Sequence, residues 1–148
     1  MNKTAVGLLG LGLAGIIGLA ATANPPAVHP DVEQRILTMR AAKSALEPLQ
    51  AMMAGRMRFD RDTARGARAA LVDATGDIPR HFRPETYDPL SRARAGIWRH
   101  PDLFDAHARQ AKRAARGIRT GSLNRLRQTL PQMINACLAC HNRFRQMR

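Results

Sequence analysis

The stretch Cys137-Leu138-Ala139-Cys140-His141, close to the end of a chain of 148 residues, has the C-x-x-C-H pattern of a covalent haem attachment site. Two thiols can add to the two vinyl groups of one porphyrin, and the adjacent histidine can offer an imidazole nitrogen to the iron. In a helix, residues three and four apart share a face. The motif therefore predicts one c-type haem, bound covalently by Cys137 and Cys140, with His141 as an axial ligand of the iron.

Two other chemistries use a C-x-x-C pair, and the sequence fits neither. A thioredoxin-like redox pair lies beside a βαβ unit, whereas no strand pattern surrounds this motif. A zinc site needs further ligands of the same kind, and the chain has only these two cysteines. Neither alternative accounts for the histidine that follows directly, so covalent haem is the interpretation that we keep.

The N-terminal residues predict export. Lys3 precedes an apolar run from Ala5 to Ala20, and Ala21-Thr22-Ala23 is similar to a signal-peptidase cleavage site. We therefore expect residues 1–23 to be a secretory signal peptide, residues 24–30 a leader and residues 31–148 the cytochrome domain. The apolar run is short for a membrane span, and an uncleaved anchor is the alternative. Because c-type haem is attached outside the cytoplasm, the expected location is the periplasm.

The composition favours a helical and strongly basic domain. Aromatic residues make up only 4% of the chain, and 24 basic residues against 11 acidic ones give a formal net charge of +13. Ala, Leu and Arg, which favour helices, are abundant. So positive a protein should be attracted to redox partners with acidic surfaces or to an anionic membrane surface. Nucleic acid is the usual partner of so basic a chain, but export argues against it.

Apolar residues recur at steps of three and four over four segments, which predicts four amphipathic helices. The segments span residues 31–54, 60–75, 102–119 and 122 to the C-terminus. Asp31 and Ser122 should cap the first and the last helix, and Gly76-Asp77 should end the second. The pattern predicts an all-α fold, an antiparallel four-helix bundle with a buried site between its helices.

The sequence also indicates where the bundle is irregular. Pro48 and Pro131 lie inside the first and fourth helices, and proline bends a helix. A long connection, residues 77–101, joins the second helix to the third, and a loop of that length predicts a short helix near residues 89–98. Four apolar side chains of this region should pack under the bundle: Ile78, Phe82, Ile97 and Trp98.

The residues alone leave the sixth iron ligand open. Met39 lies on the apolar stripe of the first helix, so periodicity alone makes it a core residue, and the other methionines have the same interpretation. Four histidines outside the motif are expected at the surface or in helix caps: His29, His81, His100 and His107. A protein ligand in the sixth position makes an electron carrier, whereas a five-coordinate iron binds small gases.

The chain resembles the cytochrome c prime family, which are four-helix c-type cytochromes with the haem motif near the C-terminus. Phe144 and Arg145 occupy positions where this family has an aromatic residue followed by arginine. The Ile97-Trp98 pair resembles the family's R-A…I-W segment, and Arg35 matches an arginine that the family places beside the haem. The resemblance covers essentially the whole mature chain and implies a covalently bound haem c with one iron.

The resemblance also bears on position 39. In the family, the residue four after the helix-one arginine faces the distal side of the iron, and in gas-binding members it is typically a bulky apolar residue. Here it is Met39, and the pattern R-x-x-x-M is similar to the low-spin cytochrome c-556 branch, whose iron has His and Met ligands. The resemblance therefore implies His141 and Met39 as axial ligands, and its position for Arg35 favours a place by the haem. Guanidinium binds carboxylate in a bidentate fork, so Arg35 and Arg145 are candidates to pair with haem propionates or to line the haem edge. The alternative is that they are ordinary solvated charges among many arginines. Many family members form homodimers, which the sequence leaves open.

The function expected from these observations is a periplasmic electron carrier rather than an enzyme. Apart from Arg35, the stripe of the first helix offers no polar acid–base residue for peroxide or nitrite chemistry. The alternative is a five-coordinate, high-spin protein that binds nitric oxide or carbon monoxide, in which Met39 only packs over the iron.

Overall fold

The structure is a computed structural model and describes residues 28–147. The predicted signal peptide and most of the leader lie outside the described residues. Within these residues five helices follow one another: α1 (Pro30–Met53), α2 (Arg61–His81), α3 (Gly96–Arg99), α4 (Pro101–Gly117) and α5 (Leu123–Phe144). Among the described residues, β structure is limited to one isolated bridge, between Ala93 and Arg145. The all-α fold class is therefore confirmed.

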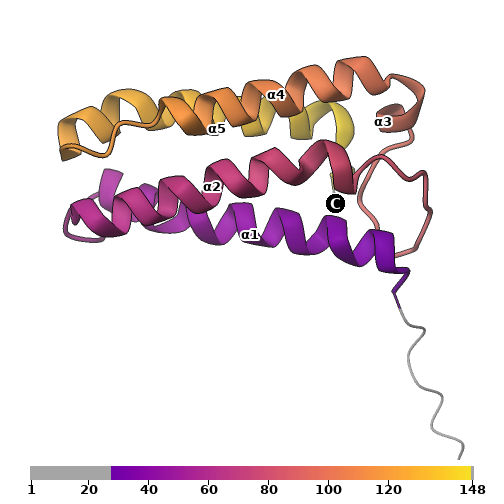
Figure 1. The fold of residues 1–148 in the computed structure, drawn as a ribbon, viewed down its shortest axis with the longest axis horizontal. Helices are drawn as coiled ribbons and strands as arrows, with labels where there is room; N and C mark the ends of the chain where they lie inside the picture. The colour runs from indigo at the N-terminus through magenta and orange to yellow at the C-terminus, as the bar shows by residue number, and fades with distance from the viewer. Residues whose placement is uncertain (1–27, 148) are drawn as a thin grey trace, which may run out of the picture.

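The four long helices form two layers (Figure 1). α1 and α2 make one layer and α4 and α5 make the other. Around the bundle, α1 contacts α2, α2 contacts α4, α4 contacts α5, and α5 returns to α1. The single turn of α3 lies at the end where residues 82–95 cross from one layer to the other. This is the antiparallel four-helix bundle that the sequence predicts.

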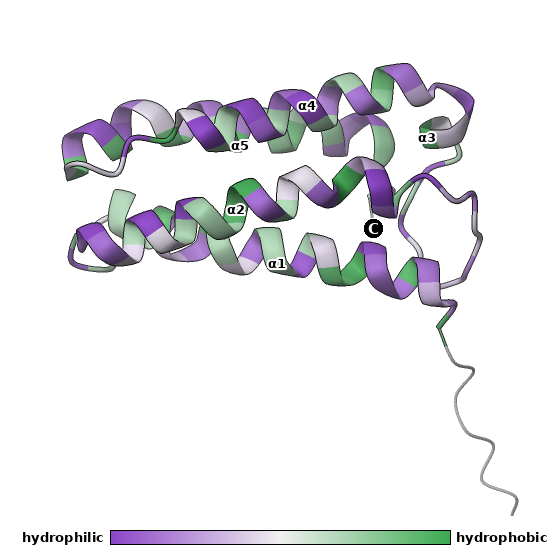
Figure 2. Ribbon diagram, viewed as in Figure 1, coloured by the Kyte–Doolittle hydropathy of each residue, from purple (hydrophilic) through white to green (hydrophobic). Residues whose placement is uncertain are grey.

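Two groups of buried side chains fill the bundle, one toward each end, and apolar positions recur along every long helix (Figure 2). We call the first the aliphatic cluster, because its buried members are Ala, Leu, Ile and Met: Ala45, Leu49, Met52, Ala64, Leu71, Ala111, Ala114, Ala115, Ile118, Leu126, Leu130, Met133 and Ala136. We call the second the aromatic cluster: Ile78, Phe82, Ile97, Phe104, Ala108 and Phe144. The predicted burial of Ile78, Phe82 and Ile97 is confirmed, and Trp98 is half-buried against the same cluster.

The second helix ends later than predicted. α2 continues through Gly76 and Pro79 and ends at His81, so the expectation that Gly76-Asp77 ends it was wrong. Glycine costs about 1 kcal/mol inside a helix, but continuing the helix places Ile78 in the aromatic cluster. Gly76 is also a packing position, because a Cβ there would lie only 3.0 Å from Nζ of Lys112 on α4. Tertiary packing therefore outweighs the local stop signal.

The helix ends and prolines show which other local signals hold. Ser122 caps α5 as predicted, because its side chain accepts a hydrogen bond from the backbone N–H of Arg125. The expectation that Asp31 caps α1 was wrong. His29 is the cap, and its Nδ1 accepts a hydrogen bond from the backbone N–H of Asp31 at 3.2 Å. α1 and α5 each run through their internal proline as one helix. The predicted short helix is α3, at the end of its predicted range.

Within residues 28–147, no helix combines the length and the hydropathy that a membrane span requires.

Candidate haem site

The C-x-x-C-H motif forms part of the last two turns of α5. The side chains of Cys137, Cys140 and His141 are all partly buried, and both cysteines are free thiols. Cys137 packs against the aliphatic cluster and Cys140 against the aromatic cluster. The motif therefore lies where the two clusters meet, while Leu138, between the cysteines, is 52% exposed and faces outward.

Burial keeps both cysteines protonated. It raises the pKa of the Cys137 thiol, and it raises the pKa of Cys140 to about 11, with a further contribution from the nearby Cys137. At neutral pH each residue is therefore a thiol rather than a thiolate. Addition of S–H across a vinyl double bond gives a thioether, so two unpaired cysteines at this spacing on one helix suit covalent haem attachment.

The state of His141 suits iron binding. Burial lowers the pKa of its imidazole, and the positive charges of Arg145 and Arg92 lower it further. The imidazole is therefore neutral at neutral pH, which is the form that donates a lone pair to a metal. Within residues 28–147 there is no group of three or more His, Cys, Asp or Glu residues arranged to hold a bare metal ion.

A non-local pairing holds the end of α5 in place. The chain pairs Ala93 with Arg145 in an antiparallel bridge, flanked by hydrogen bonds from Arg94 N–H to Phe144 O at 2.9 Å and from Gln146 N–H to Arg92 O at 2.8 Å. We call this pairing of residues 92–94 with 144–146 the C-terminal clasp. No short-range sequence signal predicts it, because its two segments lie about fifty residues apart.

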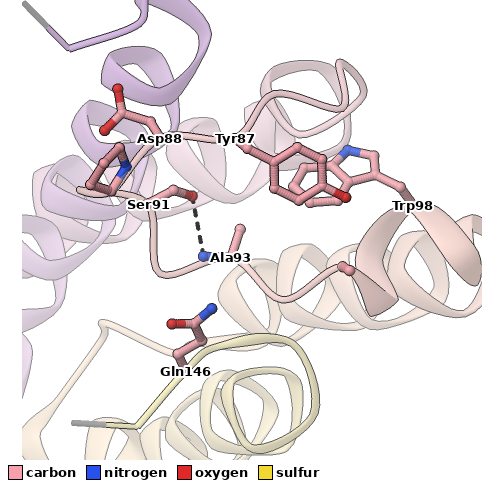
Figure 3. A pocket seen from close by; sticks show the side chains of 8 residues that line it. Tyr87, Asp88, Ser91, Ala93, Trp98 and Gln146 are labelled. Atoms are coloured by element: carbon pink, nitrogen blue, oxygen red, sulfur yellow. Dashed lines mark hydrogen bonds between the residues drawn. The ribbon is translucent and has the colours of Figure 1, made fainter.

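The clasp borders a surface cavity of about 370 Å³ (Figure 3). Tyr87 and Trp98 form its aromatic wall, with ring centroids 5.7 Å apart, and Gln146 lies across from Ser91 and Ala93. The hydroxyl of Ser91 accepts a hydrogen bond from the backbone N–H of Ala93 at 3.3 Å, which shapes the turn on the connection side.

Met39 lies on α1, half-buried, and packs against the aromatic cluster. Cys140 packs against the same cluster, so the structure brings the predicted sixth ligand and the haem motif to one region of the core. The preceding residue, Thr38, is buried; its hydroxyl donates to Gln34 O at 2.8 Å and lies 2.6 Å from Nδ1 of His81 on α2. That contact fixes this turn of α1 against the end of α2.

Arg35 is buried, with only 3% of its surface exposed. Its guanidinium donates to the carbonyl oxygens of His81, Thr86 and Pro84, at 3.3 Å for His81 and 3.0 Å for Thr86. It also lies 4.9 Å from the ring centre of Trp98. Burial lowers its pKa, and the charge of Asp31 partly offsets this effect.

These bonds give Arg35 a structural task that the sequence did not reveal. Three of its five N–H groups bind carbonyl oxygens at the end of α2 and in the connection between α2 and α3. Its contact with a haem propionate stays a prediction. The same holds for Arg145, whose side chain is exposed and whose charge acts on His141.

The arrangement fits a covalently bound haem. Two thiols and a neutral imidazole lie on one helix at the junction of two apolar clusters, and apolar surroundings favour burial of a flat porphyrin. The model of the family described as Cytochrome C' matches residues 31–145. The chain belongs to the cytochrome c' family. Proteins of this family carry a covalently attached haem c with iron, so this chain is a c-type cytochrome.

Solved structures of cytochromes c' share the fold. The protein from Rhodobacter sphaeroides is 24% identical, with a TM-score of 0.74 over 80% of this chain and 96% of its own. That from Rhodopseudomonas palustris is 23% identical, with a TM-score of 0.75 over 81% and 98%. A nitric oxide complex of a point mutant from Alcaligenes xylosoxidans is 19% identical, with a TM-score of 0.72 over 79% and 94%. No curated protein sequence matches this cytochrome significantly.

Proposed function

We propose that this cytochrome is a periplasmic electron carrier of the low-spin, c-556-like kind. Cys137 and Cys140 would hold the haem, and His141 and Met39 would ligate its iron. The observation that carries the proposal is the residue at position 39: a methionine on α1, half-buried and packed against the aromatic cluster, as Cys140 is. A thioether in this position can complete the coordination of the iron and raise its reduction potential.

The haem, when bound, supplies one-electron chemistry between ferrous and ferric iron. The protein's residues support it by keeping the site rigid and dry. The Phe82, Phe104 and Phe144 rings lie edge to face or tilted with centroids 5.3 and 5.4 Å apart, so they limit access of water to the cluster. The C-terminal clasp and Arg35 fix the segments around the cluster, which keeps rearrangement during electron transfer small.

A second function has an observation of its own. Among the structural relatives, three structures of variants of the cytochrome c prime from Alcaligenes xylosoxidans are nitric oxide complexes. If Met39 only packs over the iron, this cytochrome would instead be a five-coordinate protein that binds nitric oxide or carbon monoxide. On the comparisons alone this second function is the better supported, and the methionine at position 39 is the reason for putting the carrier first.

Optical spectroscopy of Met39→Leu tests the two functions against each other. Leucine keeps the volume and apolar character of position 39 but removes the sulfur. A carrier should show a low-spin spectrum with a methionine-to-iron charge-transfer band that disappears in Met39→Leu, and only the variant should take up carbon monoxide readily. Met52→Leu is the matched control, because Met52 is also on α1 but is buried in the aliphatic cluster.

The opposite result would replace the first function with the second. A wild-type protein that is high-spin, takes up carbon monoxide and is indifferent to Met39→Leu would be a gas-binding cytochrome c'. The proposed location has its own check, since cleavage after Ala23 would give a secreted protein that begins at Asn24.

A further inference from the structure

The charge of this cytochrome is distributed very unevenly along the chain. Residues 106–148 contain ten basic residues and no acidic one, whereas all eleven acidic residues lie before position 106. The last 43 residues therefore carry +10 of the net charge of +13. Such an asymmetry gives the molecule an electric dipole as well as a net charge.

The fold turns this sequence asymmetry into a spatial one. Residues 106–144 form most of α4 and all of α5, which together are one layer of the bundle (Figure 1). The opposite layer carries acidic residues on the same helices as its basic ones, as in the pairs Lys43–Glu47, Arg65–Asp62 and Arg80–Asp77. On α4 and α5 the carboxylates are Asp102 and Asp105, both near the start of α4, and the basic residues from Arg109 onward have no acidic residue on these helices beside them in the sequence.

Part of the haem motif is exposed at the surface of this basic layer. Leu138 is 52% exposed and Ala139 is exposed too, so the turn between the two cysteines reaches the surface. Arg143 is exposed one turn further along. On α4, Phe104 and His107 lie beside Phe144, so the antiparallel run of the two helices brings the exposed Arg109 to the level of the motif.

We propose that the α4–α5 layer, centred on Leu138 and Ala139, is the docking face for an acidic partner protein. The inference rests on the proposed function as an electron carrier and deepens it, because it states which face the partner meets. A small apolar centre with a rim of arginines matches a carboxylate-rich surface, since guanidinium binds carboxylate in a bidentate fork. The long-range field would orient the molecule so that its haem motif approaches first.

The character of α5 favours a protein partner over a membrane. A helix that lies in a membrane surface exposes large apolar residues. On α5, most exposed positions other than the arginines are amides: Asn124, Gln128, Gln132, Asn135 and Asn142. Amides hydrogen-bond to another protein surface and do not insert into lipid, and Leu138 is a single exposed leucine.

A carboxylate-terminated monolayer on a gold electrode is the probe for this face. We would compare the holo-protein with Arg109→Glu/Arg143→Glu and with Arg56→Glu/Arg58→Glu, a control with the same change of net charge. Arg56 and Arg58 are exposed in the loop between α1 and α2, at the other end of the bundle. Adsorption would be weighed on a microbalance, and the interfacial electron-transfer rate measured by voltammetry on the same film.

At low ionic strength we expect the Arg109→Glu/Arg143→Glu film to lose about tenfold in electron-transfer rate, and the control film to change by less than about twofold. The difference should vanish at high salt. Equal losses in both variants, or no loss in either, would overturn the proposal. The proposal would also be overturned if binding to anionic phosphatidylglycerol vesicles required Arg109 and Arg143 while adsorption to the monolayer did not.

Failure of the carrier function gives a different pattern. In that case adsorption would still depend on which pair of arginines is replaced, because adsorption does not require the iron to change its oxidation state. Carbon monoxide would then shift the voltammetric wave of the wild-type film, and Met39→Leu would leave the optical spectrum unchanged. Unaltered spectra of both arginine double variants are the check that the substitutions leave the haem site intact.

Discussion

The two ends of the bundle are filled by different kinds of side chain. The aliphatic cluster contains only Ala, Leu, Ile and Met among its buried members. The aromatic cluster contains three phenylalanines, with Trp98 packed against it, and it adjoins the buried polar residues Arg35 and Thr38. The motif lies between them, with one cysteine packed against each cluster.

This difference separates stability from site geometry. Aliphatic packing is non-directional and depends mainly on the apolar area removed from water. The aromatic end depends on directional contacts instead: ring pairs, the Thr38–His81 contact and the three carbonyls bound by Arg35. Substitutions at the aliphatic end should therefore change the free energy of unfolding, and those at the other end should also change the spectrum of the haem.

The largest expected effect is at the junction itself. The double substitution Cys137→Ser/Cys140→Ser should abolish covalent haem attachment, because serine hydroxyls do not form thioethers. Haem staining after denaturing electrophoresis would measure this, with Leu138→Ser as the control in the same turn. Covalent haem in the double variant would contradict the assignment of both cysteines.

A large loss of stability is expected at the aliphatic end. Leu130 is fully buried there, so Leu130→Ala should lower the free energy of unfolding by about 3 kcal/mol through the cavity it leaves. Leu138→Ala, on the same helix but exposed, should cost less than about 0.5 kcal/mol. Urea unfolding gives both values. A haem spectrum altered by Leu130→Ala would contradict the division between the two ends.

A smaller loss, with a spectral change, is expected at Arg35. Lysine cannot reach the three carbonyls that the guanidinium binds, so Arg35→Lys should cost about 2 kcal/mol. Arg40→Lys is the control, because Arg40 is exposed on the same helix. If Arg35 also contacts a haem propionate, its variant should shift the reduction potential as well. Equal stability of the two variants would contradict the role of Arg35 in holding the connection.

The smallest effect concerns the cap of α2, far from the motif. Asp60 accepts a hydrogen bond from the backbone N–H of Thr63 at 2.7 Å, and this bond holds the pKa of its carboxyl below the ordinary value. A lowered carboxyl pKa stabilises the fold above the ordinary pKa, and the benefit is lost as the pH falls through the lowered value.

Asp60→Ala should therefore lower Tm slightly at neutral pH and not in strong acid. Asp60→Asn should retain most of the cap without its pH dependence, because the amide oxygen also accepts a hydrogen bond. Thermal unfolding followed by circular dichroism at several pH values would measure both. A loss in Asp60→Ala that persists unchanged in strong acid would contradict the assigned cap.

The sequence predicted the features that depend on short-range patterns. Apolar periodicity located the long helices, and Ser122 marked the start of α5 correctly. The predicted end of the second helix at Gly76 was wrong, because a local sequence pattern does not show the gain from burying Ile78 or from packing Lys112 over the glycine. Helix α1 likewise begins with His29 as its cap, where the preference for an acidic cap pointed to Asp31.

At the candidate site, the sequence predicted the haem motif because its chemistry lies in five consecutive residues. The sequence did not predict the hydrogen bonds of Arg35 or the pairing beside His141, since these contacts join segments about fifty residues apart. A single sequence carries no signal for such contacts. Pro84 and Pro89 do lie in the irregular connection that the prolines indicated, whereas Pro79 and Pro101 lie in α2 and α4.

The C-terminal clasp has a practical consequence for handling the protein. Because residues 144–146 are hydrogen-bonded to residues 92–94, a truncation that removes Arg145 and Gln146 would free the last turn of α5. That turn follows directly on His141. An affinity tag would therefore be safest after Arg148 and behind a flexible spacer, since a bulky fusion joined directly to Gln146 would compete for the space beside Tyr87 and Trp98.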